Sequence, residues 1–139
     1  MRGLLFDVNI QSHRAHFARL LDQNGLSAVF AELGVSMKIL ADLKLPLDID
    51  DRSLWYHCQS QDFVLLTDNR NEHGSESLQA TLVDSWMIGN LPVLTLSSKT
   101  RLARDRAYAQ RVAADIADVL FGVFQSGEFR DQARVWIPR

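Results

Sequence analysis

Three short apolar runs stand out from the alternation of apolar and polar positions along the chain. They are GLLFDVNI (Gly3 to Ile10), FVLLT (63–67) and LPVLTLSS (91–98). Runs of this length, bounded by polar residues, are typical of strands that are buried on both faces of a sheet. We therefore expect three central strands.

Between these runs the apolar residues recur at helical spacing. One helix is predicted to begin at Ser12 as its N-cap and to stop at Gly25, and a second, short one covers DIDDRSLWYHCQSQ (48–61). The second begins with aspartates, which suit the positive end of a helix dipole. It directs three residues toward a core: Leu54, Trp55 and Cys58.

Two further helices are predicted in the second half of the chain. The first is bounded by Gly74 and Gly89 and has an apolar stripe made of Leu78, Leu82, Val83 and Trp86. The other is a long C-terminal helix at about 102–124. Residues 26–47 leave two alternatives, since they divide at Gly34 either into two short helices or into a strand and a helix.

Strands that alternate with helices predict a mostly parallel central sheet, because parallel strands need crossover connections and those are usually helices. The expected fold class is therefore α/β, with three α/β/α layers. The 139 residues, 47% of them hydrophobic, suit a single domain over 1–139 without a linker or repeat.

Composition limits the classes of partner. The net charge is −2 and the pI is about 6.0, so no bulk positive field attracts nucleic acid. Cys58 is the single cysteine, the first residues do not resemble a signal peptide, and no apolar run approaches the roughly 20 residues that span a bilayer. We expect a cytoplasmic protein with no membrane association.

Acidic side chains follow two of the apolar runs. Asp7 and Asp68 stand at strand ends, and ligands of open parallel α/β sheets bind beyond the carboxyl ends of the strands. With a third acid from a helix start, Asp50 or Asp51, they would repel one another unless a cation neutralised them. Oxygen ligands favour Mg²⁺ or Mn²⁺. The alternative for each acid alone is that it caps a helix or starts a turn.

Three stretches, LLFDVNI, DIDDRSLWYHCQ and FVLLTDNRN, resemble small PIN-like domains in their order and spacing. The resemblance is to a bacterial branch whose first strand ends in Asp-Glu-Asn and whose later strand ends in Thr-x-Asp-x-Asp-Phe, and it runs from about Leu4 to Leu96. It implies a PIN-like fold and metal-dependent cleavage of single-stranded RNA. The residues that match the catalytic and metal-binding positions are Asp7, Asp51 and Asp68, supported by Asn9 and Thr67, with Asp50 as an alternative to Asp51.

The chain departs from this pattern in two places. Val8 stands where the branch has Glu, and Arg70 or Asn71 replaces the second acid of the later motif. Glu72 either compensates in part for that acid or is a solvated loop residue. Asp84 could supply a fourth acid, although its place opposite the apolar stripe favours a surface aspartate. The alternative function is a catalytically degenerate scaffold that acts as an interaction or toxin–antitoxin-type regulatory protein. Its partner would be a second copy or a cognate antitoxin-like protein, contacted through the last helix and the tail ARVWIPR.

Basic residues near the strand ends are candidates for binding the RNA. We expect Arg70, Lys99 and Arg14 to contact substrate, while His13 and His16 either flank the site or share a transition metal. The run that includes Arg101, Arg104 and Arg106 either binds a phosphodiester backbone or is solvated beside Asp105.

A receiver domain is a further alternative, because Asp7, Asp68, Ser97 and Lys99 supply its residue types. A receiver has its lysine one strand after the hydroxyl, whereas Lys99 is two residues from Ser97.

Overall fold

The computed structural model describes residues 2–68 and 77–139. Within them lies a five-stranded sheet in the order β2-β1-β3-β4-β5, and every neighbouring pair is parallel. The strands are β1 (Arg2–Phe6), β2 (Val35–Ile39), β3 (Phe63–Thr67), β4 (Val93–Leu96) and β5 (Arg134–Ile137). The predicted α/β class with a parallel sheet is confirmed.

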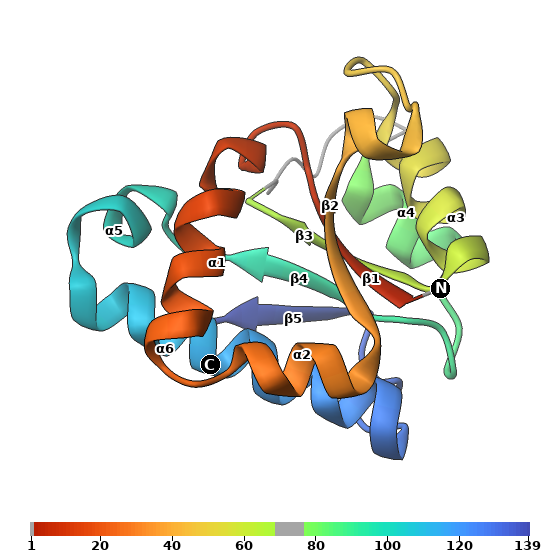
Figure 1. Ribbon diagram of the computed structural model, residues 1–139. Helices are drawn as coiled ribbons and strands as arrows, with labels where there is room; N and C mark the ends of the chain where they lie inside the picture. The colour runs from red at the N-terminus through yellow and green to blue at the C-terminus, as the bar shows by residue number, and fades with distance from the viewer. Residues whose placement is uncertain (1, 69–76) are drawn as a thin grey trace.

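Helices cover both faces of the sheet (Figure 1). They are α1 (Arg14–Gln23), α2 (Ser27–Leu33), α3 (Asp51–Gln61), α4 (Leu78–Ser85), α5 (Lys99–Arg104) and α6 (Arg106–Phe121). Short 3-10 turns at Gln11–His13 and Leu40–Leu43 and a π-type turn at Gly122–Ser126 complete the described elements. Helices α1, α2, α5 and α6 pack on one face and α3 and α4 on the other, consistent with three α/β/α layers.

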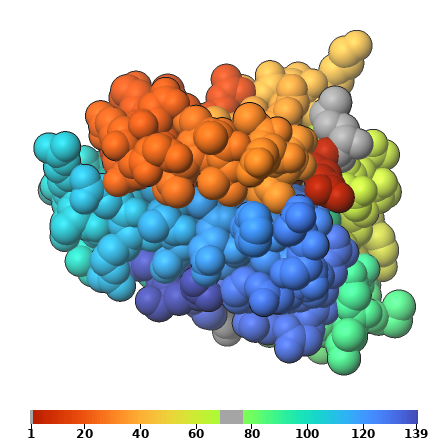
Figure 2. All heavy atoms as spheres, turned by 60° about the horizontal axis from the view of Figure 1, so that its bottom comes forward, coloured from red at the N-terminus to blue at the C-terminus, as the bar shows by residue number. Residues whose placement is uncertain are grey.

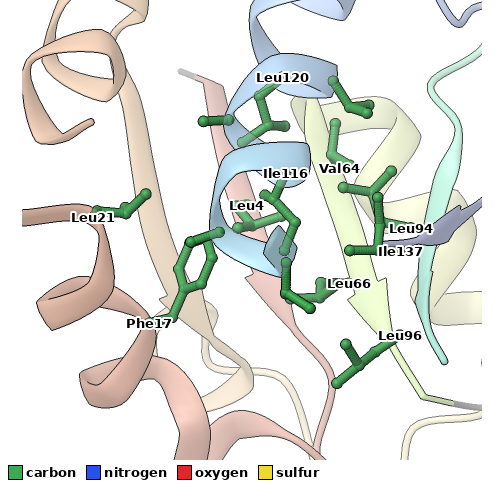
Figure 3. Close-up of a cluster of buried hydrophobic side chains, with 14 of the residues drawn as sticks. Leu4, Phe17, Leu21, Val64, Leu66, Leu94, Leu96, Ile116, Leu120 and Ile137 are labelled. Carbon is green, nitrogen blue, oxygen red and sulfur yellow. The ribbon is translucent and has the colours of Figure 1, made fainter. Parts of the chain in front are cut away.

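The larger core lies between the sheet and α6. Alternate strand residues such as Leu4, Val64 and Leu94 meet Ile116 and Leu120 of α6, and all five are fully buried (Figure 3). Helices α1 and α2 contact α6 and lie beside it over the same face (Figure 2). This face therefore has a continuous apolar layer.

The smaller core lies between the sheet and α3 and α4. The strand positions between those of the larger core, such as Leu5 and Leu65, point to this side. They pack against Leu54, Trp55 and Cys58, the three residues that the sequence directs toward a core. The prediction for this helix is confirmed.

Two of the five strands are absent from the sequence prediction. Residues 26–47 divide at Gly34, which has a φ of 68°, but they form a helix and then the strand β2. The ARVWIPR tail, expected to offer apolar surface, contains β5, where Val135 and Ile137 are buried. Both are edge strands, so neither has the continuous apolar run of a central strand.

The C-terminal helix predicted at about 102–124 is divided in two. Asp105 interrupts it, because its carboxylate accepts a hydrogen bond from the backbone N–H of Tyr108 at 3.1 Å and so caps α6. Helix α5 therefore begins at Lys99 and ends at Arg104, and α6 begins at Arg106.

Other boundaries also differ from the prediction. The first strand ends at Phe6 and not at Ile10, because the chain turns at Asp7 and Ile10 N–H bonds to its carbonyl at 3.0 Å. Helix α1 has His13 and not Ser12 at its N-cap, since the 3-10 turn occupies Ser12.

Helix α4 is shorter than predicted. It begins after Ser77, whose side chain caps it, and ends at Ser85. Val83, expected in the apolar stripe, is 72% exposed, because Leu78, Thr81 and Leu82 make the buried face instead. Within the described ranges no helix combines the length and apolarity needed to cross a bilayer.

Candidate functional site

Asp7 and Asp68 flank the point where the strand order of the sheet reverses. The chain passes from β1 outward to β2, then returns to β3 on the other side of β1 and continues to β4 and β5. Ligands of open α/β sheets bind at such a switch point, beyond the carboxyl ends of the strands. Asp7 follows β1 directly and Asp68 follows β3. The topology therefore brings the two strand-end acids to the expected place.

Asp7 is a buried carboxyl group, 7% exposed. One oxygen accepts a hydrogen bond from the backbone N–H of Val8 at 2.7 Å, and the other accepts one from the Thr67 hydroxyl at 2.8 Å. Burial raises the pKa of Asp7; the hydrogen bonds from Thr67 and Val8 oppose this effect, and the charges of Asp51 and Asp68 add to it. Asp7 is therefore within electrostatic reach of both other predicted acids.

Asp51 and Asp50 have different surroundings at the start of α3. Asp50 is exposed and caps the helix, accepting from the backbone N–H of Ser53 at 2.8 Å and from its hydroxyl at 2.9 Å. Asp51 is half-buried, and its Oδ2 accepts from the backbone N–H of Leu78 at 3.1 Å, at the start of α4. Of the two alternatives, Asp51 is the one whose charge acts on Asp7.

Asp68 lies beside Lys99, the first residue of α5. The distance from Lys99 Nζ to Asp68 Oδ2 is 3.6 Å, and the same ammonium group donates to the carbonyl of Asn9 at 3.4 Å. Burial lowers the pKa of His13, with His16 and Lys99 adding to this effect and Asp68 opposing it. His13, Lys99 and Asp68 are therefore neighbours.

The acids are distributed over both faces of the sheet. By strand alternation, Asp7 and Thr67 continue the positions of Leu5 and Leu65, which face α3 and α4. Asp68 is one residue beyond Thr67 and lies toward Lys99 on the α1 and α5 side. Within residues 2–68 and 77–139, no group of three or more Asp, Glu, His or Cys residues is close enough to hold a metal ion.

The remaining predicted residues pair with other groups or lie outside the description. Arg14 pairs with Asp42 at 2.7 Å, in the turn after β2. Asp84 is a surface residue with a 61% exposed side chain, 3.1 Å from Arg52. Arg70, Asn71 and Glu72 lie outside the described residues.

Cys58 is not poised for nucleophilic chemistry. Its thiol is buried under the sheet, and this burial, with a smaller effect from the charge of Asp7, raises its pKa to about 12. A thiol with such a pKa stays protonated at neutral pH, and the thiolate is the reactive form.

The strand order is the flavodoxin-like one, which receiver domains share. The receiver pattern needs a lysine one strand after the hydroxyl that follows β4. Lys99 instead begins α5, where only Ser97 and Ser98 separate it from β4, so it comes before β5 and not after it. The positions of the cations therefore differ from that pattern.

The sequence prediction did not include Arg19, which lines a cavity beside this edge together with His16, Arg104 and Arg106. The available signal was its spacing of three from His16, which places both on one side of α1.

Comparisons with protein-family models, with curated proteins and with solved structures found no match to the chain.

Proposed function

We propose that the chain is a PIN-like domain that binds Mg²⁺ or Mn²⁺ at its strand-end acids and cleaves phosphodiester bonds of single-stranded RNA. The observation that carries this proposal is the position of Asp7, a buried carboxyl group within reach of the charges of Asp51 and Asp68 at the topological switch point. Neighbouring carboxylates raise one another's pKa, and a divalent cation removes that penalty.

The acids present suit a hard, hydrated cation. Mg²⁺ is usually bound through one or two carboxylates and completes its shell with water and substrate phosphates. Asp7 with either Asp51 or Asp68 supplies that number, so three protein ligands are not needed. A bound metal would activate a water molecule and stabilise charge on the phosphoryl oxygens.

The neighbouring residues have roles that do not depend on the metal. The Thr67 hydroxyl fixes the orientation of the Asp7 carboxylate through their 2.8 Å hydrogen bond. Lys99 is held between Asp68 and the Asn9 carbonyl, where its ammonium group would attract a phosphate and offset the charge that develops on it.

A second candidate function is an interaction or regulatory scaffold of the same fold that has lost catalysis. It is favoured by the separation of the acids onto two sides of the sheet and by the bond from Leu78 N–H that occupies one oxygen of Asp51. The exposed apolar residues Val83, Met87 and Ile88 would then contact a cognate protein or a second copy.

Manganese binding measured by calorimetry separates the two functions. We expect the wild type to bind Mn²⁺, Asp68→Asn to lose most of this binding, and Asp84→Asn, which changes a surface acid, to retain it. The variants should keep the wild-type circular dichroism spectrum, since neither change touches a core.

A fluorescent single-stranded RNA would then be tested for Mn²⁺-dependent cleavage by the same three proteins. Equal loss of binding in Asp84→Asn would place the metal elsewhere. Absence of binding by the wild type at millimolar Mn²⁺ would reject the nuclease and leave the scaffold.

A further inference from the structure

A cavity of about 360 Å³ lies between α1 and the junction of α5 and α6. Its polar lining comes from two segments that are far apart in the chain: His16, Arg19 and Gln23 on one side, and Arg104, Asp105 and Arg106 on the other. Arg19, Arg104 and Arg106 are exposed, so their guanidinium groups are accessible to a ligand.

The cavity has an excess of positive charge. Within the described residues, none of its three arginines forms an ion pair with a carboxylate. Asp105 is the acid in the lining, and its carboxylate is already bound by Tyr108 N–H and by Arg101, at 3.1 Å and 3.2 Å. Three cations that face one cavity repel one another, and an anion removes that repulsion.

The cavity adjoins the candidate site on the side of Asp68. Helix α5 begins with Lys99, which contacts Asp68, and ends with Arg104 in the cavity. At 1.5 Å per residue, these two ends are about 8 Å apart along the helix axis. On the opposite wall, His16 of the cavity acts electrostatically on His13, which is itself within reach of Asp68 and Lys99.

We propose that this cavity is a phosphate-binding subsite for a single-stranded nucleic acid. It holds a backbone phosphate next to the phosphate that lies at the strand-end acids. The identity of the polymer rests on the proposed function. Arginine suits this role because its planar guanidinium group binds phosphate oxygens through two parallel hydrogen bonds. A subsite of this kind would let a chain of net charge −2 bind a polyanion locally.

Fluorescence anisotropy with a 5′-fluorescein-labelled oligouridylate, in EDTA so that no cleavage occurs, tests the subsite. We expect the double variant Arg104→Gln/Arg106→Gln to bind at least about tenfold more weakly at low salt, because hydrogen bonds to charged groups are lost. The salt dependence of log K should also become shallower by about 0.7 for each lost phosphate contact. Arg111→Gln is the matched control, since Arg111 is an exposed arginine of α6 outside the cavity lining.

The outcomes separate the subsite from the nuclease. Unchanged binding by the double variant, equal loss in Arg111→Gln, or no binding by the wild type would each overturn the subsite. A wild type that binds through the cavity but does not cleave would support the subsite and reject the nuclease. If the wild type cleaves RNA while the double variant binds oligouridylate normally, the result would support the nuclease and reject the subsite.

Discussion

The two faces of the sheet are covered to different extents. On the α6 side, apolar residues from all five strands and from α1, α2, α5 and α6 form one cluster. On the α3 and α4 side the cluster is smaller, and it leaves β5 partly uncovered. There Trp136 is 45% exposed, and Arg134 donates a hydrogen bond to the buried Thr95 hydroxyl at 2.8 Å.

This difference indicates where polar groups are buried. Asp7 and Thr67 extend the smaller core, where a carboxyl group is buried against a hydroxyl and within reach of the charge of Asp51 at the start of α3. The α6 side is closed by apolar residues, and its charges, Lys99 and Arg104 among them, lie outside the core. The smaller core therefore ends in Asp7, and the other groups proposed to act on a substrate, Asp68 and Lys99, lie at the edge of the larger one.

The largest expected effect is on the free energy of unfolding, when one large residue is truncated in each of the two cores. Ile116→Ala, in the centre of the α6 core at 0% exposure, should lower the free energy of unfolding by about 4 kcal/mol. Leu54→Ala, in the smaller core, should lower it by about 2 to 3 kcal/mol, because a cavity surrounded by fewer buried residues collapses more easily. Urea denaturation measures both. A larger loss for Leu54→Ala would contradict the comparison.

A smaller effect is expected at the polar end of the smaller core. Thr67→Val removes the hydroxyl that bonds to Asp7 and leaves a buried carboxylate oxygen without that donor, at a cost of about 1 to 3 kcal/mol. Thr67→Ser keeps the hydroxyl and is the control. Urea denaturation at neutral pH should rank them wild type, Ser, then Val. Equal stability of Ser and Val variants would show that the hydroxyl does not hold Asp7.

The smallest effect concerns the polar junction outside the larger core. The backbone N–H of Tyr108, with Arg101, holds the pKa of Asp105 below its ordinary value of 3.8. A group with a depressed folded pKa contributes stability that is present above 3.8 and is lost as the pH falls through the folded pKa. Asp105→Asn keeps a cap acceptor but cannot ionise, so its melting temperature should be slightly below that of the wild type at pH 7, and the difference should disappear as the pH falls below the folded pKa. An unchanged acid profile would contradict this assignment.

The central part of the fold could be predicted because its residues carry local signals. The continuous run FVLLT coincides with β3, and the aspartates before Leu54 mark the start of α3. Edge strand β2 has mostly half-buried residues, and β5 alternates buried residues with more exposed ones, so neither shows the continuous apolar run of a central strand. The division at Asp105 was missed because the apolar spacing continues through a residue whose capping bond is visible only in three dimensions.

The candidate site was predicted in its residues and only partly in its arrangement. The sequence by itself determined that acids follow the first and third strands and that adjacent strand residues point to opposite faces, since both are local properties of an extended backbone. Only the tertiary structure decided that Asp7 is buried against Thr67, that Asp68 lies beside Lys99, and that Arg19 shares a cavity with Arg104. These contacts depend on strand order and helix packing, which join segments that local sequence cannot relate.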